Sequence, residues 1–184
     1  MLLNKPIKTT RLFLKNLEPA DASGLYKEWV NDPEVNRFLE IRRSPPDNVK
    51  LSKFISKMND SDNNLLLGIF LQNGAHIGNI KLGPINTSSY RGMIGLLIGD
   101  KNYWGKGFAT EAIVAISNYA FEFLNLNRVE AGLYSSNIAS LKAFFKAGFE
   151  EEGRLKSYWK IDDGWADEIL VGRVKKYSEV KGLR

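Results

Sequence analysis

The sequence contains no cysteine and a single histidine, His76. Disulfides, thiolate metal sites, a cysteine nucleophile and any site of several histidines are therefore excluded. A Ser-His-Asp triad would need His76 itself as its base. No apolar run approaches the roughly 20 residues of a membrane span, and the amino-terminal residues lack the apolar region of a signal peptide. We therefore expect a cytoplasmic protein without a metal.

The composition that remains is that of an ordinary globular chain. Its 184 residues suit one domain with a core of its own, and hydrophobic residues make up 43% against 26% charged residues. Lys and Arg number 26 against 21 Asp and Glu, which gives a formal net charge of +5. This charge suits an anionic ligand such as a nucleotide cofactor, and it also permits nucleic acid or acidic protein partners.

The apolar pattern predicts a mixed α/β chain. Strands are expected at residues 11–17, 65–71, 77–82, 94–98 and 128–134, and in a final pair around residues 161–164. Helices are expected at about residues 18–29, 33–38, 49–58, 108–125 and 138–147, with Phe123 on the apolar face of the fourth. Asn73-Gly74 predicts a hairpin, and the apolar strand at 94–98 is typical of the centre of a sheet. The order of elements indicates a mixed sheet with one central βαβ crossover.

The most informative segment is 98–112, where a strand ends, a turn with Gly105 and Gly107 follows, and a long helix begins at once. Glycine lets the backbone adopt positive φ and lets an anion approach the amides. The first amides of the helix have no partners within it and lie at the positive end of its dipole, so the turn can bind phosphate. Gly-x-Gly alone also occurs in strand-to-helix turns without a ligand. Thr110 stands where a dinucleotide fingerprint needs its third glycine, and no P-loop Gly-Lys-Ser/Thr follows.

Residues 103–112, Tyr-Trp-Gly-Lys-Gly-Phe-Ala-Thr-Glu-Ala, resemble the acetyl-CoA pyrophosphate motif of the GNAT superfamily of N-acetyltransferases. Downstream, residues 137–149 resemble that family's Asn-x-x-Ser and Lys-x-Gly-Phe segments, and upstream, residues 10–12 and 29–35 resemble its opening. The resemblance is greatest to the branch of Rim-type ribosomal-protein N-terminal, spermidine and amino-sugar acetyltransferases. It covers about residues 9–175.

This resemblance implies a single N-acetyltransferase domain, residues 1–184. Its twisted mixed sheet would have about seven strands flanked by helices and a V-shaped split between two central parallel strands. The split would hold the pantetheine arm of acetyl-CoA, the co-substrate, with an N–H near Leu97 or Ile98 facing the thioester oxygen. The cofactor-binding residues implied are Leu97, Ile98, Gly99, Trp104, Gly105, Lys106, Gly107, Phe108, Ala109, Thr110, Asn137, Ser140 and Phe144. The partners implied are acetyl-CoA and an amine, with neither membrane nor nucleic acid, for a monomer or a homodimer.

Acyl transfer from a thioester to an amine needs a neutral amine, a donor for the oxyanion and an acid for the thiolate. Ser140 is the first candidate for the acid and Tyr134 the second, against the ordinary interpretations of a helix-surface serine and a strand-end aromatic residue. Asn137 is a candidate pantetheine ligand, an N-cap, or both. Many relatives carry a catalytic tyrosine where Phe144 stands, and phenylalanine cannot donate a proton.

The general base is the least defined group. Relatives often place a glutamate at the start of the central strand, where residues 91–94 read Arg-Gly-Met-Ile. Glu130 is the catalytic candidate if an apolar setting raises its pKa, and a solvated strand residue otherwise. His76 follows the Asn-Gly turn, which favours an exposed hairpin histidine, and a water chain is a further alternative. Glu111, in the first turn of the long helix, is expected to be structural.

The acceptor stays open among a protein N-terminus, a polyamine and an amino sugar. In relatives the acceptor site is walled by the segments that here contain Trp29, Arg37, Phe38, Tyr158 and Trp159. The carboxylates are scattered along the sequence without an acidic cluster, which favours a small-molecule acceptor. Two other classes stay open: a CoA-binding module without catalysis, and a basic nucleic-acid-binding domain, although aromatic and basic residues do not interleave as a stacking platform requires.

Overall fold

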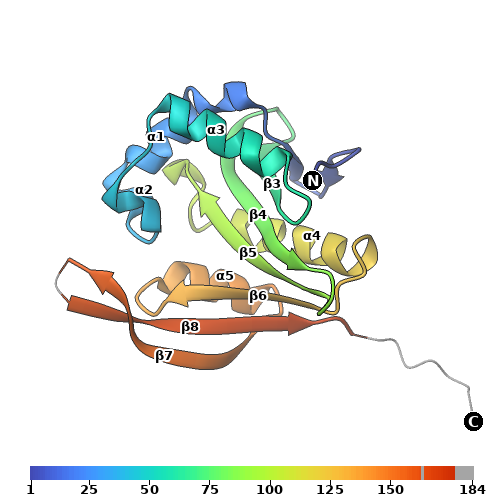
Figure 1. Ribbon diagram of the computed structural model, residues 1–184, viewed down its shortest axis with the longest axis vertical. Helices are drawn as coiled ribbons and strands as arrows, with labels where there is room; N and C mark the ends of the chain where they lie inside the picture. The colour runs from blue at the N-terminus through green and yellow to red at the C-terminus, as the bar shows by residue number, and fades with distance from the viewer. Residues whose placement is uncertain (163, 177–184) are drawn as a thin grey trace, which may run out of the picture.

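A twisted mixed sheet forms the centre of the structure, a computed structural model that describes residues 1–162 and 164–176. Within these residues it has eight strands in the order β1-β2-β3-β4-β5-β6-β8-β7 (Figure 1). The strands are β1 (Ile7–Lys8), β2 (Leu12–Asn16), β3 (Leu65–Leu71), β4 (His76–Asn86), β5 (Arg91–Ile98), β6 (Arg128–Tyr134), β7 (Glu150–Ile161) and β8 (Gly164–Val174). Every neighbouring pair is antiparallel except β5 and β6, which are parallel.

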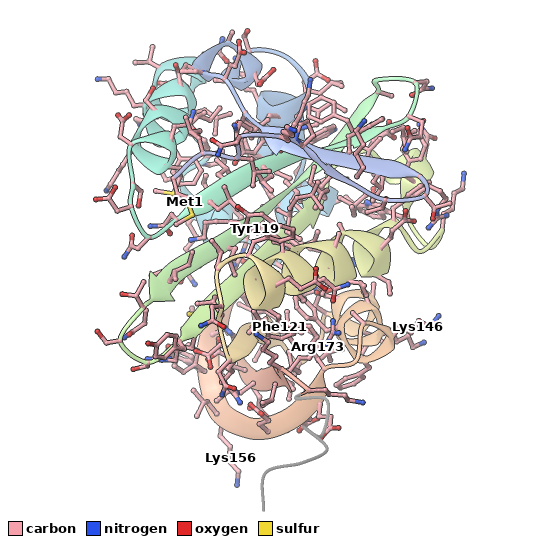
Figure 2. The ribbon with its side chains drawn as sticks, turned by 90° about the vertical axis from the view of Figure 1, so that its right-hand side faces the viewer. Met1, Tyr119, Phe121, Lys146, Lys156 and Arg173 are labelled. Carbon is pink, nitrogen blue, oxygen red and sulfur yellow. The ribbon has the colours of Figure 1, made fainter. Side chains whose placement is uncertain are left out.

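Helices cover both faces of this sheet. They are α1 (Leu25–Asn31), α2 (Pro33–Asn36), α3 (Asn48–Asn59), α4 (Phe108–Glu122) and α5 (Ile138–Lys146), with 3-10 turns η1 (Pro19–Ala22), η2 (Glu40–Arg43) and η3 (Lys101–Tyr103). Helices α4 and α5 bury one hydrophobic cluster against the sheet, and α1 and α3 bury a second on the opposite face. Figure 2 views the α4 face, where Arg173 of β8 lies over the ring of Phe121 at 5.4 Å. In the described part of the chain, no helix is long and apolar enough to span a membrane.

The predicted elements are largely confirmed, with three corrections. The sheet has one strand more than the expected seven or so, because the two-residue β1 is too short to show a period in sequence. The helix expected over 18–29 is divided, since Gly24 adopts a φ of 107° between η1 and α1. Phe123 follows the end of α4 and is 72% exposed, so it does not belong to the apolar face. Asp163 of the second hairpin turn lies outside the described residues.

The two parallel strands separate along their length, which confirms the V-shaped split. Strands β5 and β6 are paired only from Arg91↔Arg128 to Met93↔Glu130. Beyond that point β5 continues to pair with β4, and β6 with β8, so their free edges diverge (Figure 1). The apolar residues 96–98 are consequently half-buried rather than enclosed.

Candidate functional site

The open end of the split brings two helix N-termini together. Because β5 and β6 are parallel, their carboxyl ends lie at the same edge of the sheet. Helix α4 begins after the turn that follows β5, and α5 begins after the turn that follows β6. The sequence therefore folds into a groove between two strands with two helix N-termini at its mouth.

The turn before α4 is shaped to receive an anion. Gly105 and Gly107 adopt φ values of 71° and 81°, in the left-handed region that side chains disfavour. Gly107 is the N-cap of α4, and no side chain of the described residues caps the first-turn amides. These amides, starting at Phe108, carry the positive end of the helix dipole, and Lys106 adds an exposed cation.

Other residues of the predicted cofactor set brace this turn. The indole Nε1 of Trp104 donates a hydrogen bond to the carbonyl oxygen of Ile98 at 2.7 Å. The amide of Gly99 donates to the carbonyl oxygen of Ile77 at 2.9 Å, and a side chain at position 99 would overlap the ring of Trp29. Gly99 is therefore required by the packing of Trp29.

The amino-terminal end of α5 carries the predicted pantetheine ligand and acid. The Oδ1 of Asn137 accepts a hydrogen bond from the amide of Ser140 at 3.2 Å, so Asn137 is the N-cap of the helix. The hydroxyl of Ser140 is half-buried and has no hydrogen-bond partner within the described residues. Phe144, by contrast, is 1% exposed and meets Phe149 edge-on, with ring centroids 5.0 Å apart. Its side chain belongs to the core, and its contact with the cofactor stays a prediction.

Tyr134 ends β6 inside an aromatic cluster. Its ring stacks on Trp159 at 4.8 Å between centroids and tilts against Phe38 at 5.7 Å. Its hydroxyl oxygen accepts a hydrogen bond of 3.0 Å from Nη1 of Arg42, in η2. The structure therefore brings four of the five predicted acceptor-wall residues together. Phe38 and Trp159 contact Tyr134, the guanidinium of Arg37 lies 4.7 Å from the ring centre of Phe38, and Tyr158 meets Trp159 edge-on at 5.0 Å. Trp29, from α1, lies in the separate hydrophobic cluster on the α1 and α3 face.

The geometry is that of a known family. The acetyltransferase (GNAT) domain matches residues 11–150. The chain belongs to the GNAT acetyltransferase family. The match covers the opening strand, the split, the glycine turn and α5, and it confirms the resemblance carried by residues 103–112.

Individual GNAT proteins agree with this assignment. The chain is 33% identical over 173 residues to the uncharacterized N-acetyltransferase p20 of Bacillus licheniformis, spanning 91% of this chain and 95% of the relative. It is 30% identical over 175 residues to the probable N-acetyltransferase YjcK of Bacillus subtilis (strain 168), with 90% and 94% covered. The spermidine N-acetyltransferase of Vibrio cholerae, solved with CoA and spermine, shares the fold with a TM-score of 0.81 at 21% identity, covering 90% and 96%. The protein is therefore an acetyltransferase that acts on an amine.

Glu130 lies at the closed end of the split. It stands opposite Met93 on the last paired rung of β5 and β6. Its carboxylate oxygens accept hydrogen bonds from Arg91 at 2.7 Å and Arg128 at 2.9 Å, and Arg128 also pairs with Glu152. Two guanidinium partners and this location favour a structural ion-pair role over that of a GNAT general base.

His76 is not the exposed hairpin histidine that the Asn-Gly turn predicts. Its ring stacks on Phe70 at 4.4 Å and meets Trp29 edge-on at 4.9 Å between centroids. Its Nε2 lies 3.0 Å from the carbonyl oxygen of Gly78 and 2.9 Å from Oδ1 of Asn79, so this nitrogen donates to two oxygens. Burial lowers the pKa of the His76 imidazole, which favours a neutral ring. Tertiary packing against α1, invisible in the local sequence, encloses it.

The structure also reveals groups that sequence reasoning missed. Arg11 holds the turn before α4: its Nη1 donates to the carbonyl oxygen of Lys106 at 3.1 Å, and its guanidinium lies 4.2 Å from the ring centre of Phe108. Glu168 of β8 is a carboxylate only 8% exposed, at the wall of the split. One signal in the sequence could have pointed to Glu168: it is an acidic residue between Ala166 and Leu170, which lie on the same face of the strand. In the described residues, no group of three or more His, Asp or Glu is placed to hold a metal ion.

Glu111 ties Arg11 to α4, as its expected structural role suggests. Its carboxylate accepts hydrogen bonds from the Thr9 hydroxyl at 2.6 Å, the Arg11 amide at 2.9 Å and the Arg11 Nε at 2.6 Å. Burial would raise the pKa of the Glu111 carboxyl, but these hydrogen bonds outweigh it and hold that pKa below its ordinary value. A lowered carboxyl pKa contributes stability above the unfolded pKa, and this stability is lost as the pH falls through the folded pKa.

We expect Glu111→Gln to lower the melting temperature at pH 7 and to flatten its fall toward acidic pH. The physical reason is that glutamine keeps the shape of the side chain but removes the charge that these donors stabilise. Thermal unfolding measured across pH 3–7 checks this, with the exposed Glu122→Gln of the same helix as the matched control. Parallel melting curves for the wild type and both variants would contradict it.

Proposed function

We propose that residues 1–184 form a single N-acetyltransferase domain, with its core at about 9–175, that uses acetyl-CoA as its donor. The observation that carries the proposal is the split between β5 and β6, which opens beside the uncapped glycine turn. An extended pantetheine arm fits between two strand edges that lack partners. The pyrophosphate fits the first amides of α4, where the dipole, Lys106 and Arg11 supply positive charge. We also propose a cytoplasmic location, because the donor is an intracellular metabolite.

In this arrangement acetyl-CoA supplies the thioester, and the protein positions a hydrogen-bond donor and an acid around it. The backbone near Leu97 and Ile98 on the free edge of β5 would present an N–H to the carbonyl oxygen as it gains charge. Asn137 would cap α5 through its oxygen and offer its amide nitrogen to the pantetheine. Ser140, with its free hydroxyl one turn into α5, would supply a proton to the departing thiolate, with Tyr134 as the alternative.

We expect Ser140→Ala to lower kcat by about 10²-fold, the usual contribution of a positioned acid, while leaving the Kd for CoA unchanged. The hydroxyl acts only on the leaving group, so binding of the donor does not require it. Steady-state kinetics and calorimetric CoA binding separate the two effects. Ser52→Ala, another helix serine but in α3, is the control. Wild-type turnover in the Ser140 variant would transfer the role to Tyr134 or to water.

The test of the function itself is thiol release from acetyl-CoA in the presence of an amine panel. The panel contains polyamines, amino sugars and N-terminal peptides, and CoA affinity is measured alongside. We propose a small-molecule amine as the acceptor, so a polyamine or an amino sugar should give the highest kcat/KM. CoA binding without turnover of any amine would favour a CoA-binding module, and the absence of CoA binding would overturn the proposal.

A further inference from the structure

The face of the sheet opposite α4 and α5 is open at the split. Leu97 of β5 packs with the cluster beneath α1 and α3, so alternate β5 residues, Met93 and Gly95, lie on that same face. Because Met93 pairs with Glu130, the β6 residues on this face include Gly132 and Tyr134. The contact between Tyr134 and Arg42 of η2 agrees, since η2 belongs to the amino-terminal region on this side.

Glycines occupy the first positions beyond the paired part of β5 and β6 whose side chains would lie on this face of the sheet. Gly95 and Gly132 each stand two residues beyond the last paired rung on their strands. A side chain at Gly95 would meet nothing within 4 Å. A side chain at Gly132 would overlap Oε1 of Glu168. The β6 wall of the opening is therefore covered by a carboxylate, and the β5 wall is bare.

Glu168 reaches this position from β8, where it pairs in register with Tyr134. It is 8% exposed, yet its carboxylate has neither a hydrogen bond nor an ion pair among the described residues. The charge of Glu40, from η2, acts on it, and Arg42 of the same turn is hydrogen-bonded to Tyr134, the register partner of Glu168 on β6. The neighbour of Glu168 on β7 is the uncharged Leu155. Burial, and then the charge of Glu40, raise the pKa of the Glu168 carboxyl. A buried, unpaired carboxylate is costly and indicates a ligand that supplies the missing cation.

We propose that Glu168 receives the ammonium group of the acceptor at this opening and takes its proton, with Glu40 as a second anionic contact. This inference rests on the proposed acetyl transfer at the same split. It supplies the base that neither the start of β5 nor Glu130 provides. The sequence separates Glu40 and Glu168 widely, so the scattered carboxylates of the linear chain become an acidic pair only in the folded protein.

The proton and electron balance of the step is simple. The ammonium group gives one proton to the Glu168 carboxylate, and the neutral amine attacks the thioester carbonyl. As the C–N bond forms, the C–S bond breaks and its electron pair leaves with the CoA sulfur. Ser140 or solvent gives a proton to the thiolate, and the second proton lost from the amine nitrogen passes to the resulting Ser140 alkoxide or to solvent. Glu168 then loses its proton to solvent through the same opening.

The pair also defines the class of acceptor. Glu168 and Glu40 make no ion pair among the described residues, so these two carboxylates favour a substrate that carries positive charge beyond the reacting amine, and they repel one that carries phosphate or carboxylate. A polyamine fits this environment, whereas a nucleotide-linked amino sugar brings negative charge to it. Within the proposed small-molecule acceptors, the structure therefore favours the polyamine.

The test compares Glu168→Gln, Glu168→Asp and Glu40→Gln with spermidine as the probe amine. We expect Glu168→Gln to lower kcat by about 10²-fold without changing the Kd for CoA, and to remove the acidic limb of kcat/KM against pH. Glu168→Asp should retain that limb at a reduced rate. Glu40→Gln should raise KM for spermidine and move the limb to lower pH, because the charge that raises the pKa of Glu168 is gone. A UDP-linked amino sugar should be acetylated more slowly than spermidine by the wild type.

Two controls separate this role from folding and from the donor site. Gly132→Ala should displace the carboxylate and reduce kcat while every charge remains, and the exposed Glu151→Gln on β7 should behave as wild type. A carboxyl with a raised pKa loses its stabilising contribution as pH rises through that pKa, so Glu168→Gln should melt no lower than wild type at pH 7. Wild-type kcat and an unchanged pH profile in Glu168→Gln would overturn the inference. Failure of the wild type to bind CoA would overturn the proposed function instead.

Discussion

Replacing Gly107 by aspartate is expected to weaken CoA binding by about 10³-fold. Gly107 is the N-cap of α4, at the mouth of the split, and its position is open apart from Nη2 of Arg11, 3.6 Å from where a Cβ would stand. A carboxylate there would lie about 4 Å from the pyrophosphate, and like charges at that distance near a protein surface repel by about 4 kcal/mol. Each 1.4 kcal/mol is about tenfold in Kd.

The aspartate would also satisfy the first-turn amides itself, as an N-cap does, so it competes for the groups that the pyrophosphate needs. Gly107→Asn is the matched control, because asparagine tolerates the φ of 81°, caps a helix in the same way and has no charge. Calorimetric CoA binding at low and high salt measures the difference. The Asp variant should recover affinity partly at high salt, since salt screens exposed charges. Equal CoA affinities of the Asp and Asn variants would show that the pyrophosphate does not bind at this turn.

Filling the split at Gly95 is expected to abolish most turnover while leaving the fold at least as stable. Gly95→Val places three carbon atoms where the β5 wall is bare, so the thioester and the amine cannot meet at their proper distance. A misplacement of about 1 Å costs on the order of 10²-fold in rate, so kcat/KM should fall by at least about that factor. Valine favours a strand, and removing a strand glycine reduces the entropy of the unfolded chain, so the melting temperature should not fall.

Gly153→Val is the control for this substitution. Gly153 lies in edge strand β7, where an added Cβ would make ordinary contact with Leu170 at 3.6 Å. Both variants add the same group to a strand, but only Gly95 borders the split. Loss of activity in both would point to a general disturbance of the sheet. Full activity in Gly95→Val would show that the acceptor and donor meet elsewhere.

The parts of the site that could be predicted from the sequence depend on local geometry. The turn with Gly105 and Gly107 lies between a strand and a helix, so its positive φ values and uncapped amides follow from neighbouring residues. Asn137 caps α5 for the same reason. The strand and helix periods also act over a few residues, which is why most element positions were foreseen.

The differences between the predictions and the structure have more than one physical origin. His76 was expected at an exposed hairpin, but α1 brings Trp29 against it. Phe144, of the predicted cofactor set, is enclosed by Phe149 and the core, and its contact with the cofactor stays a prediction. The helix over 18–29 was foreseen as continuous, although Gly24 divides it.

By itself the sequence determined the family, the order of elements and the glycine turn before α4, because each depends on residues that are close together along the chain. Only the tertiary structure decided where β5 and β6 separate. The point of separation is where β5 continues to pair only with β4, and β6 only with β8. The tertiary structure also decided that Arg11 reaches the turn before α4 and that Glu168 of β8 is buried where the charge of Glu40 acts on it. A charge acquires its neighbours, and so its chemistry, from packing between segments that are far apart in sequence.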